Sequence, residues 1–148
     1  MHECSGIHRI SLIKNNIAVI GEPIPRCRGL RSLLLWYNTK LTSISDSFFD
    51  SLRYLVVLDL CQNSIKLLSA SMGSFRHLKL LKLSRTIIEM LPKCLSSLKH
   101  LQFLDVSGCQ QLSSLHLGIY GHKYMVYLNV KGTKMKSLRP KYPRSSIY

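Results

Sequence analysis

The chain has 148 residues, about the length of one domain, and its 21 basic and 7 acidic residues give a formal net charge of +14. No apolar run approaches the length of a membrane span, and neither a nucleotide-binding loop of the form G-x-x-x-x-G-K-[ST] nor a C-x-x-C metal motif is present. These features exclude a second large domain and argue against a membrane span, a bound nucleotide and a bound metal, so no cofactor is predicted.

A leucine-rich skeleton recurs six times along the chain. Each copy has the form apolar-x-x-apolar-x-apolar-x-x-(N, C or T) followed by an apolar pair, with leucine at most of the apolar places, and the copies begin at residues 7, 30, 55, 78, 101 and 125. A period of about 23–25 residues is typical of leucine-rich repeats. The sequence therefore predicts an α/β leucine-rich-repeat solenoid over residues 1–138, a curved right-handed superhelix of about six repeats, followed by a polar C-terminal tail over residues 139–148.

Each repeat is predicted to contribute one short strand to a parallel sheet on the concave face. In the clearest copy, residues 58–60 (Leu-Asp-Leu) show the period of two that is expected of a strand with its leucines pointing inward. Three residues further on, Asn63 is predicted to turn inward and to satisfy backbone groups of the loop. Thr86, Cys109 and Thr133 hold the same place with fewer hydrogen-bonding groups, so the later repeats should depend more on packing.

The segments between the strands are predicted to return along the convex side. The short period leaves too few residues for long helices, so single helical turns or irregular stretches are expected, and Pro92 suits a turn. No repeat can bury its apolar face alone, so stability should be roughly additive between neighbouring repeats. The convex residues predicted to be apolar are Phe48, Phe49, Leu52, Met72, Phe75, Leu95, Leu98 and Ile119.

Neither end of the chain carries a recognisable capping repeat, although solenoids normally need one at each end. The chain is therefore expected to be a piece of a longer protein. The five cysteines are odd in number and scattered, no secretory leader precedes the first repeat, and no N-glycosylation acceptor occurs. These features predict a reducing compartment, the cytoplasm with the nucleus as an alternative.

The net positive charge raises the question of a polyanionic partner. Arg53, Arg76, Lys93 and Lys99 fall at loop and convex positions that are spread along the chain. A dense group lies near the end of the sequence: Lys131, Lys134, Lys136, Arg139, Lys141 and Arg144. A solvated surface is favoured over binding to nucleic acid or to acidic lipid, so nucleic acid is a disfavoured partner.

The cysteines and histidines do not indicate a catalytic centre. Cys109 occupies the inward position where a small buried side chain is needed, and His77 and His100 precede the first leucine of successive repeats at matching places. Residues 2–8 hold two histidines and a cysteine without the spacing of a metal site. Repetition indicates structural roles, so the chain is predicted not to be an enzyme and to have no small-molecule substrate.

The outward face of the sheet is predicted to carry function, because it presents side chains from every rung on a rigid concave wall. Its middle column should consist of Ser11, Leu34, Asp59, Lys82, Asp105 and Asn129, and the column beside it of Arg9, Arg31, Val57, Leu80, Phe103 and Tyr127. Interface hot spots favour aromatic and arginine residues of this kind, although exposed aromatics can equally serve to cover neighbouring rungs. The candidate protein-binding residues are Arg9, Arg31, Leu34, Trp36, Asp59, Lys79, Lys82, Phe103, Asp105, Tyr127 and Asn129.

Residues 30–138 resemble the repeat domain of plant intracellular nucleotide-binding leucine-rich-repeat disease-resistance proteins. The sequences of residues 55–60 (LVVLDL), 88–92 (IEMLP) and 104–109 (LDVSGC) are similar to motifs of the family. The alternation of a Thr-type with a Gly-Cys-type repeat is similar to it as well. The opening residues 8–12 (HRISL) also resemble the repeat that follows the nucleotide-binding region in those proteins.

The resemblance implies recognition of a pathogen effector, a host guard protein or the protein's own switch domain in the plant defence response. Ser69 and His116 depart from the family, which usually has Pro there, and nucleotide binding is not implied because its motifs are absent from this sequence. The alternative is an intracellular leucine-rich-repeat scaffold that regulates a small GTPase or another signalling protein. Such scaffolds keep a stricter period than the irregular steps between the repeats of this chain.

Overall fold

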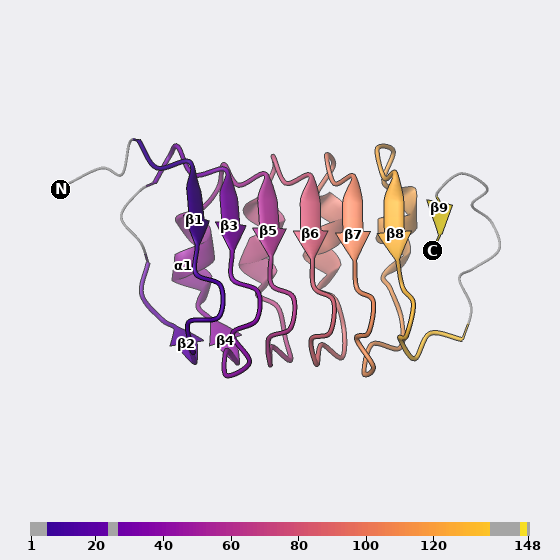
Figure 1. Cartoon of the computed structure of the whole chain (residues 1–148). Helices are drawn as coiled ribbons and strands as arrows, with labels where there is room; N and C mark the ends of the chain where they lie inside the picture. The colour runs from indigo at the N-terminus through magenta and orange to yellow at the C-terminus, as the bar shows by residue number, and fades with distance from the viewer. Residues whose placement is uncertain (1–5, 24–26, 137–145, 148) are drawn as a thin grey trace.

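The computed structural model describes residues 6–23, 27–136 and 146–147, and its centre is a parallel sheet (Figure 1). Equivalent residues of successive repeats pair in register, for example Leu33 with Leu58, and Leu58 with Leu81. The predicted leucine-rich-repeat solenoid is therefore confirmed. The strands follow one another in chain order: β1 (Arg9–Ser11), β3 (Ser32–Leu34), β5 (Val57–Asp59), β6 (Leu80–Lys82), β7 (Phe103–Asp105), β8 (Tyr127–Asn129) and β9 (Ser146–Ile147).

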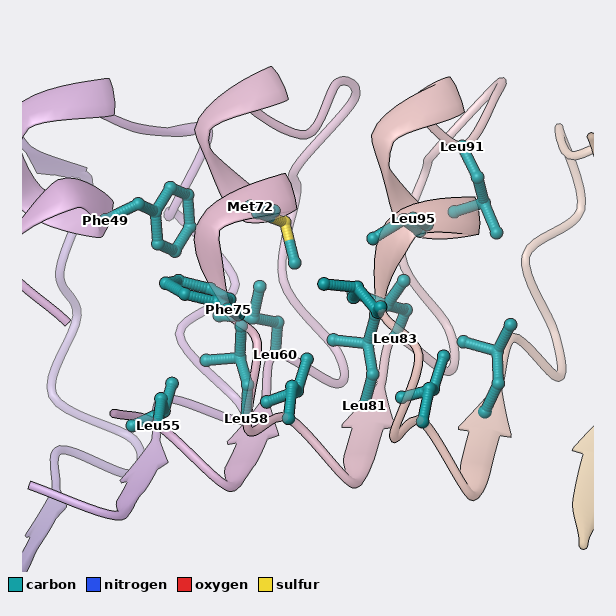
Figure 2. Close-up of a cluster of buried hydrophobic side chains, with 14 of the residues drawn as sticks. Phe49, Leu55, Leu58, Leu60, Met72, Phe75, Leu81, Leu83, Leu91 and Leu95 are labelled. Atoms are coloured by element: carbon teal, nitrogen blue, oxygen red, sulfur yellow. The ribbon is translucent and has the colours of Figure 1, made fainter. Parts of the chain in front are cut away.

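The hydrophobic core lies between the sheet and the helical turns (Figure 2). Strand residues such as Leu58 and Leu81 point toward these turns and are fully buried. The rings of Phe49 and Phe75 from two successive turns pack edge to face, with centroids 5.6 Å apart. Burial of each such side chain contributes about 1.5–3 kcal/mol. All eight apolar residues predicted on the convex side are buried.

The convex segments form single turns, as the short period predicts. They are α1 (Asp46–Asp50) and the 3₁₀ helices η1 (Ala70–Ser74), η2 (Lys93–Ser97) and η3 (Leu117–Gly121), and each turn contacts the next along the stack. The α-helix falls in the repeat that begins at Leu30, which is the longest because the next repeat begins only at Leu55. The two additional residues relative to the shortest repeats give room for α-helical geometry.

The three 3₁₀ helices begin from the same extended backbone conformation. The φ and ψ angles are −64° and 143° at Pro92, −63° and 141° at Ser69, and −63° and 139° at His116. The proline ring fixes this φ. The Ser69 hydroxyl and the His116 Nδ1 instead accept hydrogen bonds from the backbone N–H groups of Ser71 and Gly118. The two departures from Pro therefore keep the local geometry by side-chain capping.

The inward-turning residues after the strands are buried in the second to fifth repeats, and the asparagines join neighbouring repeats. The Oδ1 atom of Asn63 accepts a hydrogen bond from the N–H of Asn38 at 2.8 Å. Its Nδ2 donates to carbonyl oxygens of two consecutive repeats, at 3.1 and 3.0 Å. The Thr86 hydroxyl instead donates to one carbonyl, that of Leu83, at 2.8 Å. The Cys109 thiol also joins two repeats, since it donates to the carbonyl of Leu83 at 3.1 Å and lies 3.3 Å from the Thr86 hydroxyl. Thr86 and Cys109 thus make fewer such bonds per residue than Asn63, in line with the expectation that later repeats depend more on packing.

The residue before each of these inward positions takes a left-handed backbone conformation. Its φ is 62° at Tyr37, 56° at Gln62 and Arg85, 70° at Gly108 and 73° at Gly132. Glycine enters this region without steric cost, so the Gly-Cys type of repeat has a conformational reason. A Cβ atom at Gly108 would also lie 3.0 Å from the Cγ atom of Arg85 in the preceding repeat.

The first two repeats differ from those that follow. A second small sheet pairs β2 (Val19–Ile20) with β4 (Ser43–Ile44) in parallel, which the repeat pattern does not predict. Ile7 and Leu12 hold inward positions of the repeat but are 43% and 38% exposed, because β1 is the edge strand of the main sheet. Within the described ranges, no helix has the length and apolar character needed to cross a membrane.

At the other end of the sheet, β9 pairs with β8 in parallel. Two residues of the stretch predicted to be a polar tail therefore form a strand. His2 and Cys4 near the N-terminus, and Leu138 of the sixth repeat, lie outside the described residues. The same holds for three members of the dense basic group: Arg139, Lys141 and Arg144.

Candidate functional site

The face of the sheet away from the helical turns presents two columns of side chains, which we call together the sheet face. The first column is Arg9, Ser32, Val57, Leu80, Phe103 and Tyr127, and the second is Ser11, Leu34, Asp59, Lys82, Asp105 and Asn129. The second column contains the same six residues as the predicted middle column, because side chains alternate regularly between the two faces of each strand.

The first column differs from the prediction at one rung. The register pairs Ser32 with Arg9, so the predicted place of Arg31 in this column is wrong. Arg31 precedes its strand, and its guanidinium lies 5.5 Å from the ring centroid of Tyr54. Lys79 holds the equivalent place before β6. Both residues are exposed and stand one position before the first column, so they lie beside the sheet face and not in it.

The centre of the first column is an apolar stripe formed by Val57, Leu80, Phe103 and Tyr127, all half-buried. The rings of Phe103 and Tyr127 stack face to face, with centroids 3.9 Å apart and planes inclined by 6°. The Nζ atom of Lys82 lies 6.0 Å from the Phe103 ring centroid, within the range of a cation–π contact. The stripe is therefore a pre-ordered apolar surface with a cation at its margin.

The second column is polar over the same repeats. Lys82 stands between Asp59 and Asp105 in the register, so the charges alternate in sign. Asp59, Asp105 and Asn129 each accept with Oδ1 a hydrogen bond from the backbone N–H two residues ahead, at 3.0, 2.9 and 3.1 Å. Three predicted site residues therefore also hold the turn that follows their strand, a role that the repeat pattern did not reveal.

Trp36 is not part of the apolar stripe. Its ring meets that of Tyr37 edge on, with centroids 6.2 Å apart, and the Nζ atom of Lys14 lies 5.8 Å from the Tyr37 ring. Strands β5 and β6 separate its repeat from Phe103 on β7. The predicted aromatic set therefore divides into two groups, of which the stripe is the continuous one.

Three of the four cysteines in the described part of the chain, Cys61, Cys94 and Cys109, are poor nucleophiles. The pKa of the Cys61 thiol is raised to about 12, chiefly by burial; the hydrogen bond from Ser84 lowers this pKa, and the carboxylate of Asp59 raises it. Burial also raises the pKa of Cys94 and of Cys109. No group of three or more His, Cys, Asp or Glu side chains converges as a metal site in the part of the chain that the structure describes.

The thiols of Cys61 and Cys109 are expected to resist alkylation. Because the thiolate is the reactive species, a pKa near 12 should slow the reaction of Cys61 with iodoacetamide at about pH 8 by roughly 100-fold or more relative to an ordinary thiol. Peptide mapping by mass spectrometry measures the rates, with the guanidinium-unfolded chain as the control. Equal rates of Cys61 alkylation in the folded and unfolded chains would contradict this assignment.

One surface was missed by the sequence reasoning. Five basic residues stand two places before the first apolar residue of successive repeats, and all five are exposed. Aligning the repeats on their first apolar residue would have revealed these five residues, because they share the same position in each repeat. In the linear sequence they are separated by a whole repeat and look dispersed. We call this row the basic edge: Arg28, Arg53, Arg76, Lys99 and Lys123.

Comparison with known sequences points to one group of proteins. The family pattern described as "Leucine rich repeat" matches residues 28–84. The disease resistance protein SUMM2 of Arabidopsis thaliana is 43% identical over 60 residues, which is 40% of this chain and 7% of that protein. A second Arabidopsis protein named for disease resistance is 46% identical over 59 residues, 39% of this chain and 8% of its own length. The matched segment is therefore a small part of these relatives.

Comparison with solved structures concerns the fold alone. A leucine-rich-repeat protein of Leptospira interrogans superimposes with a TM-score of 0.74 over 91% of this chain and 34% of its own, at 20% sequence identity. The strand register, the inward leucines and the matched pattern agree with this architecture. The chain has the leucine-rich-repeat fold, residues 28–84 match the leucine-rich-repeat pattern, and about 40% of the chain is similar to plant disease-resistance proteins.

Proposed function

We propose that the chain is a non-catalytic protein-recognition module of the plant defence response, and that it contacts its partner through the sheet face. The observation that carries this proposal is the apolar stripe beside an alternating column of charges. Protein interfaces combine an apolar centre with a polar rim, and their hot spots are rich in aromatic residues. The stacked rings of Phe103 and Tyr127 supply such a centre.

The partner is a pathogen effector, a host guard protein or a switch domain of the same protein. The similarity to disease-resistance proteins supports this choice, although the matched segment is 7% of SUMM2. A rigid sheet that presents side chains from every repeat suits recognition by shape and pattern. The cysteines, scattered and odd in number, suit the cytoplasm or the nucleus as the place of recognition.

Replacing both rings of the stripe is expected to abolish partner capture. Hot-spot residues typically contribute about 2 kcal/mol or more, so the double variant Phe103→Ala/Tyr127→Ala should bind at least about 30-fold more weakly. The measurement is affinity purification of the tagged chain from plant tissue, with quantitative mass spectrometry of the retained proteins. Proteins that bind the sheet face should be retained by the unmodified chain and lost from the variant.

The matched control is Leu67→Ala/Met90→Ala, which truncates two large apolar side chains that are 62% and 61% exposed and lie outside the sheet face. It should retain the same proteins as the unmodified chain. If the ring variant and the control retain equal amounts of every specific partner, the sheet face is not the recognition surface.

A further inference from the structure

The basic edge forms a continuous row in space. Backbone hydrogen bonds three residues further along each repeat keep neighbouring repeats in register. The carbonyl of Arg31 accepts from the N–H of Val57, and the carbonyl of Lys79 accepts from the N–H of Phe103, each at 2.9 Å. Every basic-edge residue stands four places before a residue of the first column, and those column residues pair from strand to strand. Charges that are separated by a whole repeat in sequence therefore lie one rung apart.

Three shallow hollows lie between successive members of the row. They have volumes of about 400, 460 and 410 Å³, and each is flanked by two neighbouring basic-edge residues: Arg28 and Arg53, Arg53 and Arg76, and Arg76 and Lys99. The other lining residues are serine, glycine, tyrosine and histidine, and among the residues that the structure describes no acidic side chain lines these hollows. Each hollow thus presents two cations from consecutive repeats and small polar side chains, which suits an anionic group of modest size.

Aromatic rings lie beside the row, but they are stacked on one another. Tyr54 stacks on His77, with centroids 5.8 Å apart, and His100 stacks on Tyr124, with centroids 6.0 Å apart. The guanidinium of Arg31 lies 5.5 Å from the Tyr54 ring. Nucleic-acid bases need open ring faces for stacking. The Nζ atom of Lys123 lies 5.7 Å from the Tyr124 ring centroid. Each tyrosine ring therefore has both an aromatic and a cationic neighbour already, which leaves less of its face for a base.

Against the expectation drawn from the dispersed charge of the sequence, we propose that the basic edge binds the phosphodiester backbone of a single-stranded nucleic acid, largely without regard to base sequence, as a second surface independent of the sheet face. Three of its five cations are arginines, whose planar fork matches phosphate oxygens. An acidic protein is less suited, because protein interfaces need a buried apolar centre and the described residues that line the hollows include no aliphatic side chain. The five cations form one row, and one row can contact the phosphates of one nucleic-acid strand along its length.

The full chain is expected to bind a fluorescein-labelled mixed-sequence RNA or DNA oligonucleotide of about a dozen nucleotides, measured by fluorescence anisotropy. Five phosphate contacts predict a slope of log affinity against log salt of about −3.5, so affinity should fall about 100-fold between roughly 50 and 200 mM salt. The triple variant Arg53→Gln/Arg76→Gln/Lys99→Gln should reduce the slope by about 2 and weaken low-salt binding at least about tenfold.

The matched control is Lys40→Gln/Lys93→Gln/Lys136→Gln, which removes the same charge at exposed positions outside the row. It should weaken binding by less than about threefold and leave the slope nearly unchanged. Circular dichroism establishes that both triple variants keep the fold. Equal losses in the two variants, or no binding at low salt, would overturn the proposal. Tighter binding to a polyglutamate peptide of equal charge would overturn it in favour of an acidic protein, and tighter binding to a duplex would overturn the single-strand assignment.

Discussion

Leu81→Asp is expected to abolish the folded state of the middle repeats. Leu81 is fully buried on β6 and pairs with Leu58 and Leu104 in the neighbouring strands. The substitution removes about 1.5–3 kcal/mol of apolar burial. It also places a carboxylate in a core where none of the buried residues that the structure describes is basic, which costs several kcal/mol more. The sum, about 5 kcal/mol or more, is comparable with the whole stability of a typical domain.

Leu80→Asp is the matched control, because it makes the same change one residue earlier on the same strand. Leu80 belongs to the sheet face and is half-exposed, so its carboxylate can remain hydrated. Far-UV circular dichroism and urea unfolding should show a folded, moderately destabilised Leu80→Asp chain and an unfolded Leu81→Asp chain. A Leu81→Asp spectrum equal to that of the unmodified chain would contradict the strand register.

The periodic part of the fold could be predicted from the sequence. A repeat has only one arrangement in which Leu58, Leu60 and their equivalents face the same side, so the inward positions follow from the period of two within a strand. The single-turn convex segments follow from the same length constraint. The apolar residues Phe48, Phe49 and Met72 of these segments are buried, as the repeat pattern predicts.

The surface was harder to predict, because it depends on which residues from different repeats become neighbours. The predicted place of Arg31 is wrong because the first column lies two residues after the first leucine, which selects Ser32. The basic edge resembles dispersed charge in the sequence because a whole repeat separates Arg53 from Arg76. Only alignment by repeat brings such residues together. The double role of Asp105, on the sheet face and as an acceptor for its own turn, depends on side-chain geometry that spacing does not encode.

Replacing Asn63 with Ala is expected to destabilise the chain by about 3 kcal/mol, because the side chain satisfies buried backbone groups in two repeats. Its Oδ1 accepts from the N–H of Asn38 at 2.8 Å, and its Nδ2 donates to the carbonyl of Leu60 at 3.0 Å. Alanine leaves both groups without these partners. Asn15→Ala changes the equivalent residue of the first repeat, which is exposed, and should cost less than about 1 kcal/mol.

Two measurements separate coupling between repeats from general loss of stability. Urea unfolding gives the free-energy change, and hydrogen exchange at the Asn38 amide reports the hydrogen bond that crosses from one repeat to the next. Asn63→Thr should lie between the two alanine variants in stability, because a hydroxyl can still reach the local carbonyl, as Thr86 reaches Leu83 at 2.8 Å. It should nevertheless lose protection at the Asn38 amide. If Asn63→Thr kept that protection, the asparagine would not be the link between repeats, and the difference between the early and late repeats would have to arise from packing alone.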